Sequence, residues 1–170
     1  MDRDFKAEII ALLNAHQIMT IATIRRDGWP QATVVSYAND GFALYSIIGR
    51  NTQKYLNIVR DPRVSVAISG VSAQPLQYKG LSLGGHAAVV ESSAQIERFR
   101  ALVLSRNPQY KELPAPDPAM IAVLCVKPEV VSIVDYSKGF GHSDLVRVSQ
   151  DQRVELVEAM RHHWAGLQAA

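Results

Sequence analysis

The stretch that decides the fold runs from residue 42 to residue 66, FALYSIIGRNTQKYLNIVRDPRVSV. An apolar run ends in Tyr45-Ser46, and the polar turn Gly49-Arg50-Asn51-Thr52 follows it. The turn opens a short helix that carries Lys54, and Asp61-Pro62 ends the helix before a second apolar run. A helix start leaves backbone N–H groups without partners, and a hydroxyl and cations lie beside them here. The stretch therefore predicts a strand, a phosphate-binding turn, a helix over residues 52–60 and another strand.

Short strands joined by tight turns are predicted before this stretch. Residues 18–25 form a strand, Asp27-Gly28 is a strong hairpin turn, and Pro30 begins the next strand. Asn39-Asp40-Gly41 makes a second turn into a strand over residues 42–48. Three strands this close in sequence favour an antiparallel meander.

Helices and longer strands are predicted on either side of these hairpins. They are a helix over about 4–16, a strand over 64–69, a bent strand over 78–91 that contains Gly80, Gly84 and Gly85, a helix capped by Ser92 and Gln95, a hairpin of strands 120–126 and 130–136 around Lys127-Pro128-Glu129, and a helix over about 150–167 capped by Ser149 and Gln152. About six strands with appended helices indicate one α+β domain over residues 1–170, built on a closed antiparallel barrel.

Composition excludes several classes of protein. Hydrophobic residues make up 48% of the chain and charged residues 20%, so a globular domain is expected. The formal net charge of +2 comes from dispersed charges, which argues against a nucleic-acid partner. One cysteine, Cys125, and no apolar leader favour a cytoplasmic, soluble protein, and the apolar runs are too short for a membrane helix. His162 and His163 are adjacent and would diverge on a helix, so no metal site is predicted.

The 42–66 stretch, together with Trp29-Pro30-Gln31-Ala32-Thr33-Val34-Val35-Ser36, resembles the pyridoxamine 5′-phosphate oxidase-like family of flavin-binding split barrels. The resemblance extends from about Ile18 to Val148. It implies a six-stranded antiparallel split β-barrel with flanking helices, which binds flavin mononucleotide (FMN) at the interface of a homodimer. The family's strand along the flavin ring and ribityl chain corresponds to Gln31, Thr33, Val34, Val35 and Ser36.

The same resemblance implies the rest of the cofactor site. The strand end Tyr45-Ser46 approaches the ribityl–phosphate region, and Thr52 and Lys54 bind the phosphate. From the residues themselves, Arg50 adds a bidentate clamp, and Gln53 lies in the same turn. The alternative to a phosphate site is a purely structural role, in which Thr52 is an ordinary N-cap and Lys54 is a solvated charge on the helix.

A second informative segment is Asp135-Tyr136-Ser137-Lys138-Gly139-Phe140-Gly141-His142. An aromatic ring between two glycines suits a loop that reaches over a flat ligand or into a partner. The resemblance implies that Lys138, Phe140 and His142 line the pocket from the other subunit. The alternative is a glycine-rich turn with Phe140 packed as a plug and His142 on the surface.

The function predicted by the resemblance is an FMN-dependent oxidoreductase that acts on an unidentified small molecule. The chain lacks the Arg-x-His motif of the oxidase itself, which argues against vitamin B6 phosphate as the substrate. No catalytic side chain is assigned. A deazaflavin F420-dependent reductase and a non-enzymatic haem- or flavin-binding module remain as alternatives. A homodimer is expected because a monomer would leave Val89, Val90, Val131 and Ile133 incompletely covered.

Overall fold

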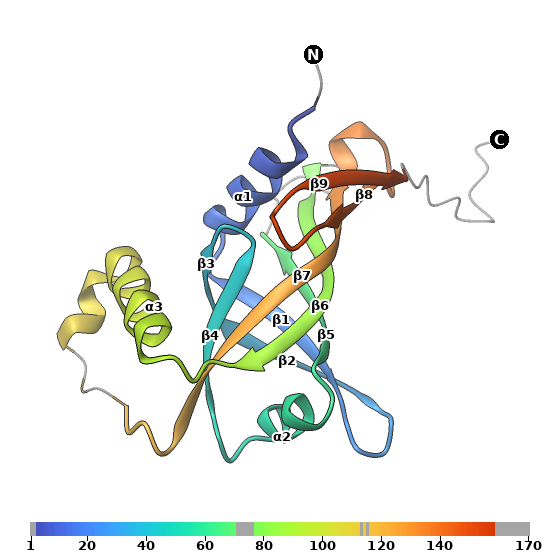
Figure 1. Ribbon diagram of the computed structural model, residues 1–170. Helices are drawn as coiled ribbons and strands as arrows, with labels where there is room; N and C mark the ends of the chain where they lie inside the picture. Colours follow the sequence, from blue (N-terminus) through green and yellow to red (C-terminus); the bar gives the residue numbers. More distant parts are fainter. Residues whose placement is uncertain (1–2, 71–76, 113, 115, 159–170) are drawn as a thin grey trace.

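The computed structural model describes residues 3–70, 77–112, 114 and 116–158, and shows one curled antiparallel sheet with α-helices around it (Figure 1). The elements in chain order are α1 (Phe5–Ala15), β1 (Ile18–Ile24), β2 (Pro30–Ser36), β3 (Ala38–Asp40), β4 (Ala43–Gly49), α2 (Gln53–Arg60), β5 (Arg63–Ser69), β6 (Lys79–Val89), α3 (Ser93–Arg106), the 3-10 helix η2 (Pro108–Glu112), β7 (Ile121–Asp135), the 3-10 helix η3 (Tyr136–Lys138), β8 (Ser143–Val148) and β9 (Val154–Glu158). The α+β split-barrel fold is confirmed, with nine strands among the described residues where six were expected.

Successive side chains along a strand point alternately to the inside and to the outside of the curled sheet. Met19, Ile21 and Thr23 of β1 are buried, and the residues between them are half-buried. In β5, Val64, Val66 and Ile68 are buried, and the residues between them are exposed. This period of two places one apolar side of each strand in a common core, as expected for a half-buried sheet.

The order of strands is β2-β1-β5-β6-β7-β4-β3, with β8 beside β7 and β9 beside β8. The expected meander is wrong at its third strand, since β4 pairs with β7 and β3 and not with β2. Across the open seam, the Ser46 hydroxyl donates a hydrogen bond to the Ser36 carbonyl at 2.8 Å.

The expected hairpin around Lys127-Pro128-Glu129 is also wrong. These residues lie inside β7, which runs unbroken from Ile121 to Asp135 and pairs with β6 from Leu124 to Asp135. Pro128 is tolerated there because it lies opposite Gly85, where the register shifts between Gly84 and Gly85 in a bulge. The bend predicted for the 78–91 strand is confirmed at this bulge.

The chain from Ser149 onward differs from the expected C-terminal helix. Ser149 and Gln152 form a turn, with the Gln152 N–H donating to the Ser149 carbonyl at 2.9 Å, and β9 then pairs with β8. The polar residues of a capping box also suit a tight turn, and pairing with β8 decides between them. The remainder of that expected helix, with His162 and His163, lies outside the described residues. The first helix, α1, the start of α2 at Thr52 and the Ser92 cap of α3 agree with expectation.

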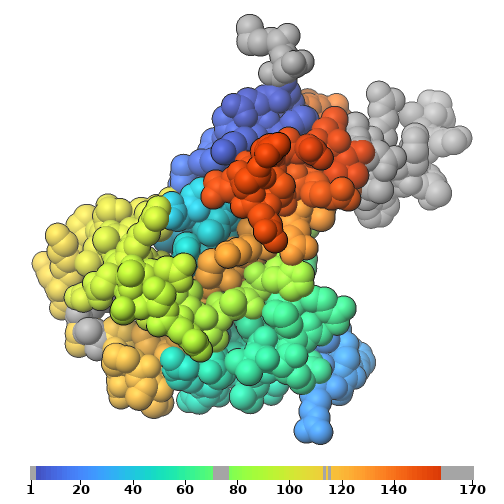
Figure 2. All heavy atoms as spheres, in the orientation of Figure 1, coloured from blue at the N-terminus to red at the C-terminus, as the bar shows by residue number. Residues whose placement is uncertain are grey.

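Packing within one chain covers most of the surface that was expected to need a partner. Val131 and Ile133 are fully buried and Val90 is nearly so, which removes this argument for a dimer. The exposed apolar side chains lie elsewhere, and include Trp29, Val34, Leu56, Val59 and Phe140. Figure 2 shows the β1–β2 hairpin, which carries Trp29, projecting from the lower end of the molecule. Among the described residues, no helix is long and apolar enough to cross a membrane.

The bulge gives a direct test of the fold. A Cβ atom on Gly85 would lie 2.2 Å from the Lys127 carbonyl oxygen, whereas one on Gly84 would meet nothing within 4 Å. Gly85→Ala should therefore lower the free energy of unfolding by about 1–3 kcal/mol, because the backbone of β7 has to move. Gly84→Ala, the matched control, should change it by less than about 0.5 kcal/mol. Urea denaturation of both variants measures the difference, and equal stabilities would contradict the described pairing.

Candidate functional site

Residues of the 49–54 turn lie together at the end of the barrel where α2 begins (Figure 1). Thr52 is the N-cap of α2, but its side chain makes no capping hydrogen bond. Its hydroxyl donates instead to the Gly49 carbonyl at 2.7 Å. The first N–H groups of α2 are thus left without a side-chain acceptor, and they carry the partial positive charge of a helix N-terminus.

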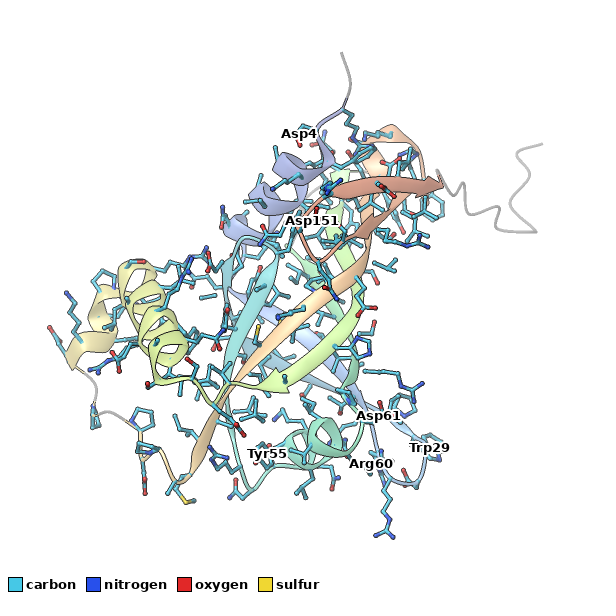
Figure 3. All side chains as sticks on the ribbon, in the orientation of Figure 1. Asp4, Trp29, Tyr55, Arg60, Asp61 and Asp151 are labelled. Atoms are coloured by element: carbon cyan, nitrogen blue, oxygen red, sulfur yellow. The ribbon has the colours of Figure 1, made fainter. Side chains whose placement is uncertain are left out.

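Two cations accompany this uncapped helix start. The Arg50 guanidinium donates to the Ile121 carbonyl at 2.6 Å and to the Tyr55 hydroxyl at 3.2 Å, and it lies 5.8 Å from the centre of the Tyr55 ring. Lys54 is half-buried and forms no ion pair with any described residue. The end of the molecule that bears Tyr55, Arg60 and Trp29 is visible in Figure 3. An anion would find donors and positive charge here.

The predicted residues of β2 alternate between two faces. Gln31, Thr33 and Val35 are half-buried and lie opposite the buried residues of β1, whereas Val34 and Ser36 are exposed. The hydroxyl oxygen of Thr33 is buried and has no hydrogen-bond partner among the described residues. One strand therefore offers an inward polar face and an outward face on which Val34 is 67% exposed.

Tyr45 and Ser46, predicted to approach the cofactor together, lie on opposite faces of β4. Ser46 is 1% exposed and its hydroxyl is engaged at the seam with β2. Tyr45 packs beneath α3, with its ring 5.8 Å from that of Phe99. Burial raises the pKa of Tyr45 to about 12, and the neighbouring Cys125 adds to the effect. Tyr45 is therefore a neutral packing residue at neutral pH, directed away from Ser46.

The sequence analysis did not single out Asn57, which is central to this end of the barrel. It is 1% exposed and hydrogen-bonds to side chains of β1, of β2 and of the first turn of α2. The available signal was its position beside Ile58 on the inward face of a predicted helix, where an apolar residue is usual.

The second predicted group lies in the loop between β7 and β8. Phe140 is 63% exposed, so it is not the packed plug of the alternative interpretation. Its ring lies 5.3 Å from that of Tyr136, which lies 5.4 Å from that of Tyr78. Gly139 and Gly141, with φ of 134° and 75°, allow the loop to present this ring.

Two buried carboxylates hold the base of this loop, which we call the Phe140 loop (residues 136–142). Asp144 pairs with Arg3, with Lys138 at 3.6 Å and with the His142 Nε2 at 3.2 Å. Asp135 pairs with Lys79 at 3.1 Å. Burial raises the pKa of each carboxyl, but hydrogen bonds from Arg3 and His142 to Asp144, and from Ser137 and Lys79 to Asp135, outweigh it, so both pKa values lie below the usual range.

The structure separates the two predicted groups within one chain. Gly49 pairs with Ile121 at the start of β7, and the Phe140 loop follows Asp135 at its end. The 15 residues of β7 span up to about 45 Å at the usual rise per residue. Lys138, Phe140 and His142 therefore follow one end of β7, whereas Arg50, Thr52 and Lys54 lie near its other end.

Comparison with known proteins places the chain in a known family. Residues 5–135 match the family model described as pyridoxamine 5′-phosphate oxidase. General stress protein 26 of Bacillus subtilis is 21% identical over 133 residues, which are 78% of this chain and 90% of that protein.

Solved structures show the same fold. A haem-binding protein from Mycobacterium smegmatis is 27% identical with a TM-score of 0.71, and the matched part covers 86% of this chain but only 60% of that protein's length. A pyridoxamine 5′-phosphate oxidase-related, FMN-binding protein from Nostoc punctiforme is 15% identical with a TM-score of 0.64, covering 94% and 98% of the two chains. Proteins with this fold thus include an FMN-binding and a haem-binding member.

The ion pairs below the Phe140 loop predict how stability depends on pH. Folding lowers the pKa values of Asp135 and Asp144, so both contribute stability that is fully present above about pH 4 and lost as the pH falls through the folded pKa values. Asp144→Asn should lower the free energy of unfolding at pH 7 by roughly 1.5–3 kcal/mol and flatten its decline below pH 4. Glu97→Gln, at an exposed pair on α3, is the control. Urea denaturation from pH 2.5 to pH 7 measures both, and an unchanged acid slope in Asp144→Asn would contradict this assignment.

Proposed function

We propose that this chain, which belongs to the pyridoxamine 5′-phosphate oxidase family, is an FMN-dependent oxidoreductase acting on a small molecule. The observation that carries the proposal is the uncapped N-terminus of α2 between Arg50 and Lys54. Free N–H groups, a guanidinium and an ammonium are the donors that bind a phosphate dianion.

The described residues fit a flavin nucleotide on two counts. The donors at the start of α2 match the phosphate, with Thr52 placing the helix N–H groups and Lys54 adding a charge. β2 begins beside α2, joined to it by the Gln31–Asn57 hydrogen bond, and supplies an extended edge strand for the polar chain and flat ring. When bound, FMN supplies hydride or electron transfer. The protein binds it, orients it and excludes water.

A homodimer accounts for the separation of the two predicted groups. The Phe140 loop of one subunit would close over the β2 and α2 region of the other, and bring an aromatic ring, the Lys138 ammonium and the His142 imidazole to the site. The exposure of Phe140, and of Val34 and Leu56 near β2 and α2, supports such a contact. His142 would then be the group that holds a proton near the substrate, with Asp144 orienting its ring.

Haem binding is the second candidate, favoured by the likeness to the haem-binding protein of M. smegmatis. In this case the protein would be a binding module, with His142 as the candidate axial ligand on the Phe140 loop. The absorption spectrum of the purified protein separates the two candidates. Absorption maxima at about 370 and 450 nm identify oxidised flavin, and a Soret band identifies haem.

The phosphate contact predicts a selective loss of affinity. Lys54→Ala should weaken FMN binding by roughly 1.5–3 kcal/mol, the range for a hydrogen bond to a charged group. It should leave riboflavin, which lacks the phosphate, nearly unaffected. Fluorescence titration of both ligands measures this, with Lys6→Ala on α1, at the other end of the barrel, as the control. Equal losses for both ligands, or none, would show that Lys54 is a solvated helix residue.

The cross-subunit contact predicts a different outcome for the Phe140 loop. Phe140→Ala should weaken FMN binding by about 0.5–1.5 kcal/mol more than the loss of buried apolar area alone would, because ring stacking is lost. It should also speed reoxidation of the reduced flavin by oxygen. The melting temperature should hardly change, because the ring is 63% exposed within the chain.

Tyr110→Ala, which removes an exposed ring on η2, is the control. Sedimentation equilibrium should give twice the 18.7 kDa of one chain. A monomer at micromolar concentration, or an unchanged reoxidation rate in Phe140→Ala, would rule out the cross-subunit loop.

A further inference from the structure

A single buried amide connects the parts of the proposed site. Asn57 lies in the second turn of α2 with 1% of its surface exposed. Its Nδ2 donates to the Thr23 hydroxyl at 3.0 Å and to the Gln31 Oε1 at 3.1 Å. Its Oδ1 accepts from the Gln53 Nε2 at 2.8 Å. Thr23 in turn donates to the Gln31 carbonyl at 3.4 Å, so side chain and backbone of Gln31 both join the network.

Both donor hydrogens and the acceptor oxygen of the Asn57 amide are used, so its burial carries no unsatisfied group. A leucine of similar size would fill the same volume without any polar partner. Its contacts would hold α2 near the sheet but would not select one register, since apolar packing is not directional. Hydrogen bonds at 3.0 Å to Thr23 of β1 and at 3.1 Å to Gln31 of β2 fix both the distance and the angle of α2 relative to these two strands.

The partners of Asn57 lie next to the residues that the proposed function uses. Gln53 is the first residue of α2, between Thr52 and Lys54. Gln31 is on β2, an edge strand whose only strand partner in the described sheet is β1. Such a strand is free to shift on the side away from β1 unless another contact holds it.

We propose that Asn57 is a positioning residue, which holds the phosphate-binding turn and the ring-binding strand at one fixed separation. This inference rests on the proposed FMN function. The Asn57 side chain would contact neither the phosphate nor the ring. It would act through Gln53 at one end of the network and through Gln31 at the other. Loss of the amide should therefore affect both halves of the cofactor, whereas loss of Lys54 affects the phosphate alone.

The test uses Asn57→Leu in the full chain, titrated with FMN and with riboflavin. We expect about five- to tenfold weaker binding of both ligands, because two sets of donors lose their alignment. At saturating FMN, the visible circular dichroism of the bound flavin should also change, since it reports the surroundings of the ring. A loss of protein stability alone would not alter that spectrum once the site is full.

Two further variants keep the result decisive. Asn39→Leu removes a second buried amide, 4% exposed on β3, which bonds to Asn14 and Gly41 away from the site. It should lower the melting temperature but leave the flavin spectrum unchanged. Thr23→Val breaks the network from β1, because it removes the hydroxyl that accepts from Asn57 and donates to the Gln31 carbonyl. It should reproduce the effect of Asn57→Leu even if that variant does not fold. The double variant should be no worse than either single one, because each removes the same connection.

The outcomes separate this inference from the proposed function. If the wild-type protein binds neither FMN nor riboflavin, the proposed function fails and the positioning role fails with it. If the wild type binds FMN but Asn57→Leu and Thr23→Val bind it equally well with the same spectrum, only the positioning role is overturned. Additive effects in the double variant would also overturn it, since independent contributions exclude a shared connection.

Discussion

The structure depends on the pairing of β6 with β7. All 11 residues of β6 are paired with β7, from Lys79 opposite Asp135 to Val89 opposite Leu124. The first half of β7 also pairs with β4, and its second half with β8. A flat pair of this length would leave the sheet open, but the bulge at Gly84-Gly85, opposite Pro128, bends both strands and lets the sheet curl around its apolar side.

The length of β7 explains why the proposed site is divided. The start of α2 lies near one end of this strand, and the Phe140 loop follows the other. If the Phe140 loop belongs to the site that we propose, one chain alone does not bring it to the start of α2. A second copy related by a twofold axis would supply the missing half to each site, which agrees with the dimer that we propose.

Buried polar groups at both ends of the barrel have the same physical role. Asn57 connects α2 to β1 and β2, and Asp144 connects the N-terminal segment, through Arg3, to the base of the Phe140 loop. Each would be costly to bury alone, and each is matched by donors or acceptors from segments distant in sequence. Apolar packing would hold these segments together, but directional hydrogen bonds determine where the functional side chains lie.

The sequence by itself determined those features that depend on neighbouring residues. The Asp27-Gly28 turn, the helix starts at Thr52 and Ser92, the strands β1 and β5 and the polar turn at residues 49–52 were all predicted, because turn and helix-start chemistry acts over a few residues. Only the tertiary structure decided which strands pair. It joined β4 to β7 instead of β2, kept Pro128 inside a strand and turned residues 154–158 into β9. It also put Tyr45 and Ser46 on opposite faces of β4 and placed Asn57 at the centre of a hydrogen-bond network. These features depend on contacts between residues far apart in the chain, so no local sequence pattern predicts them.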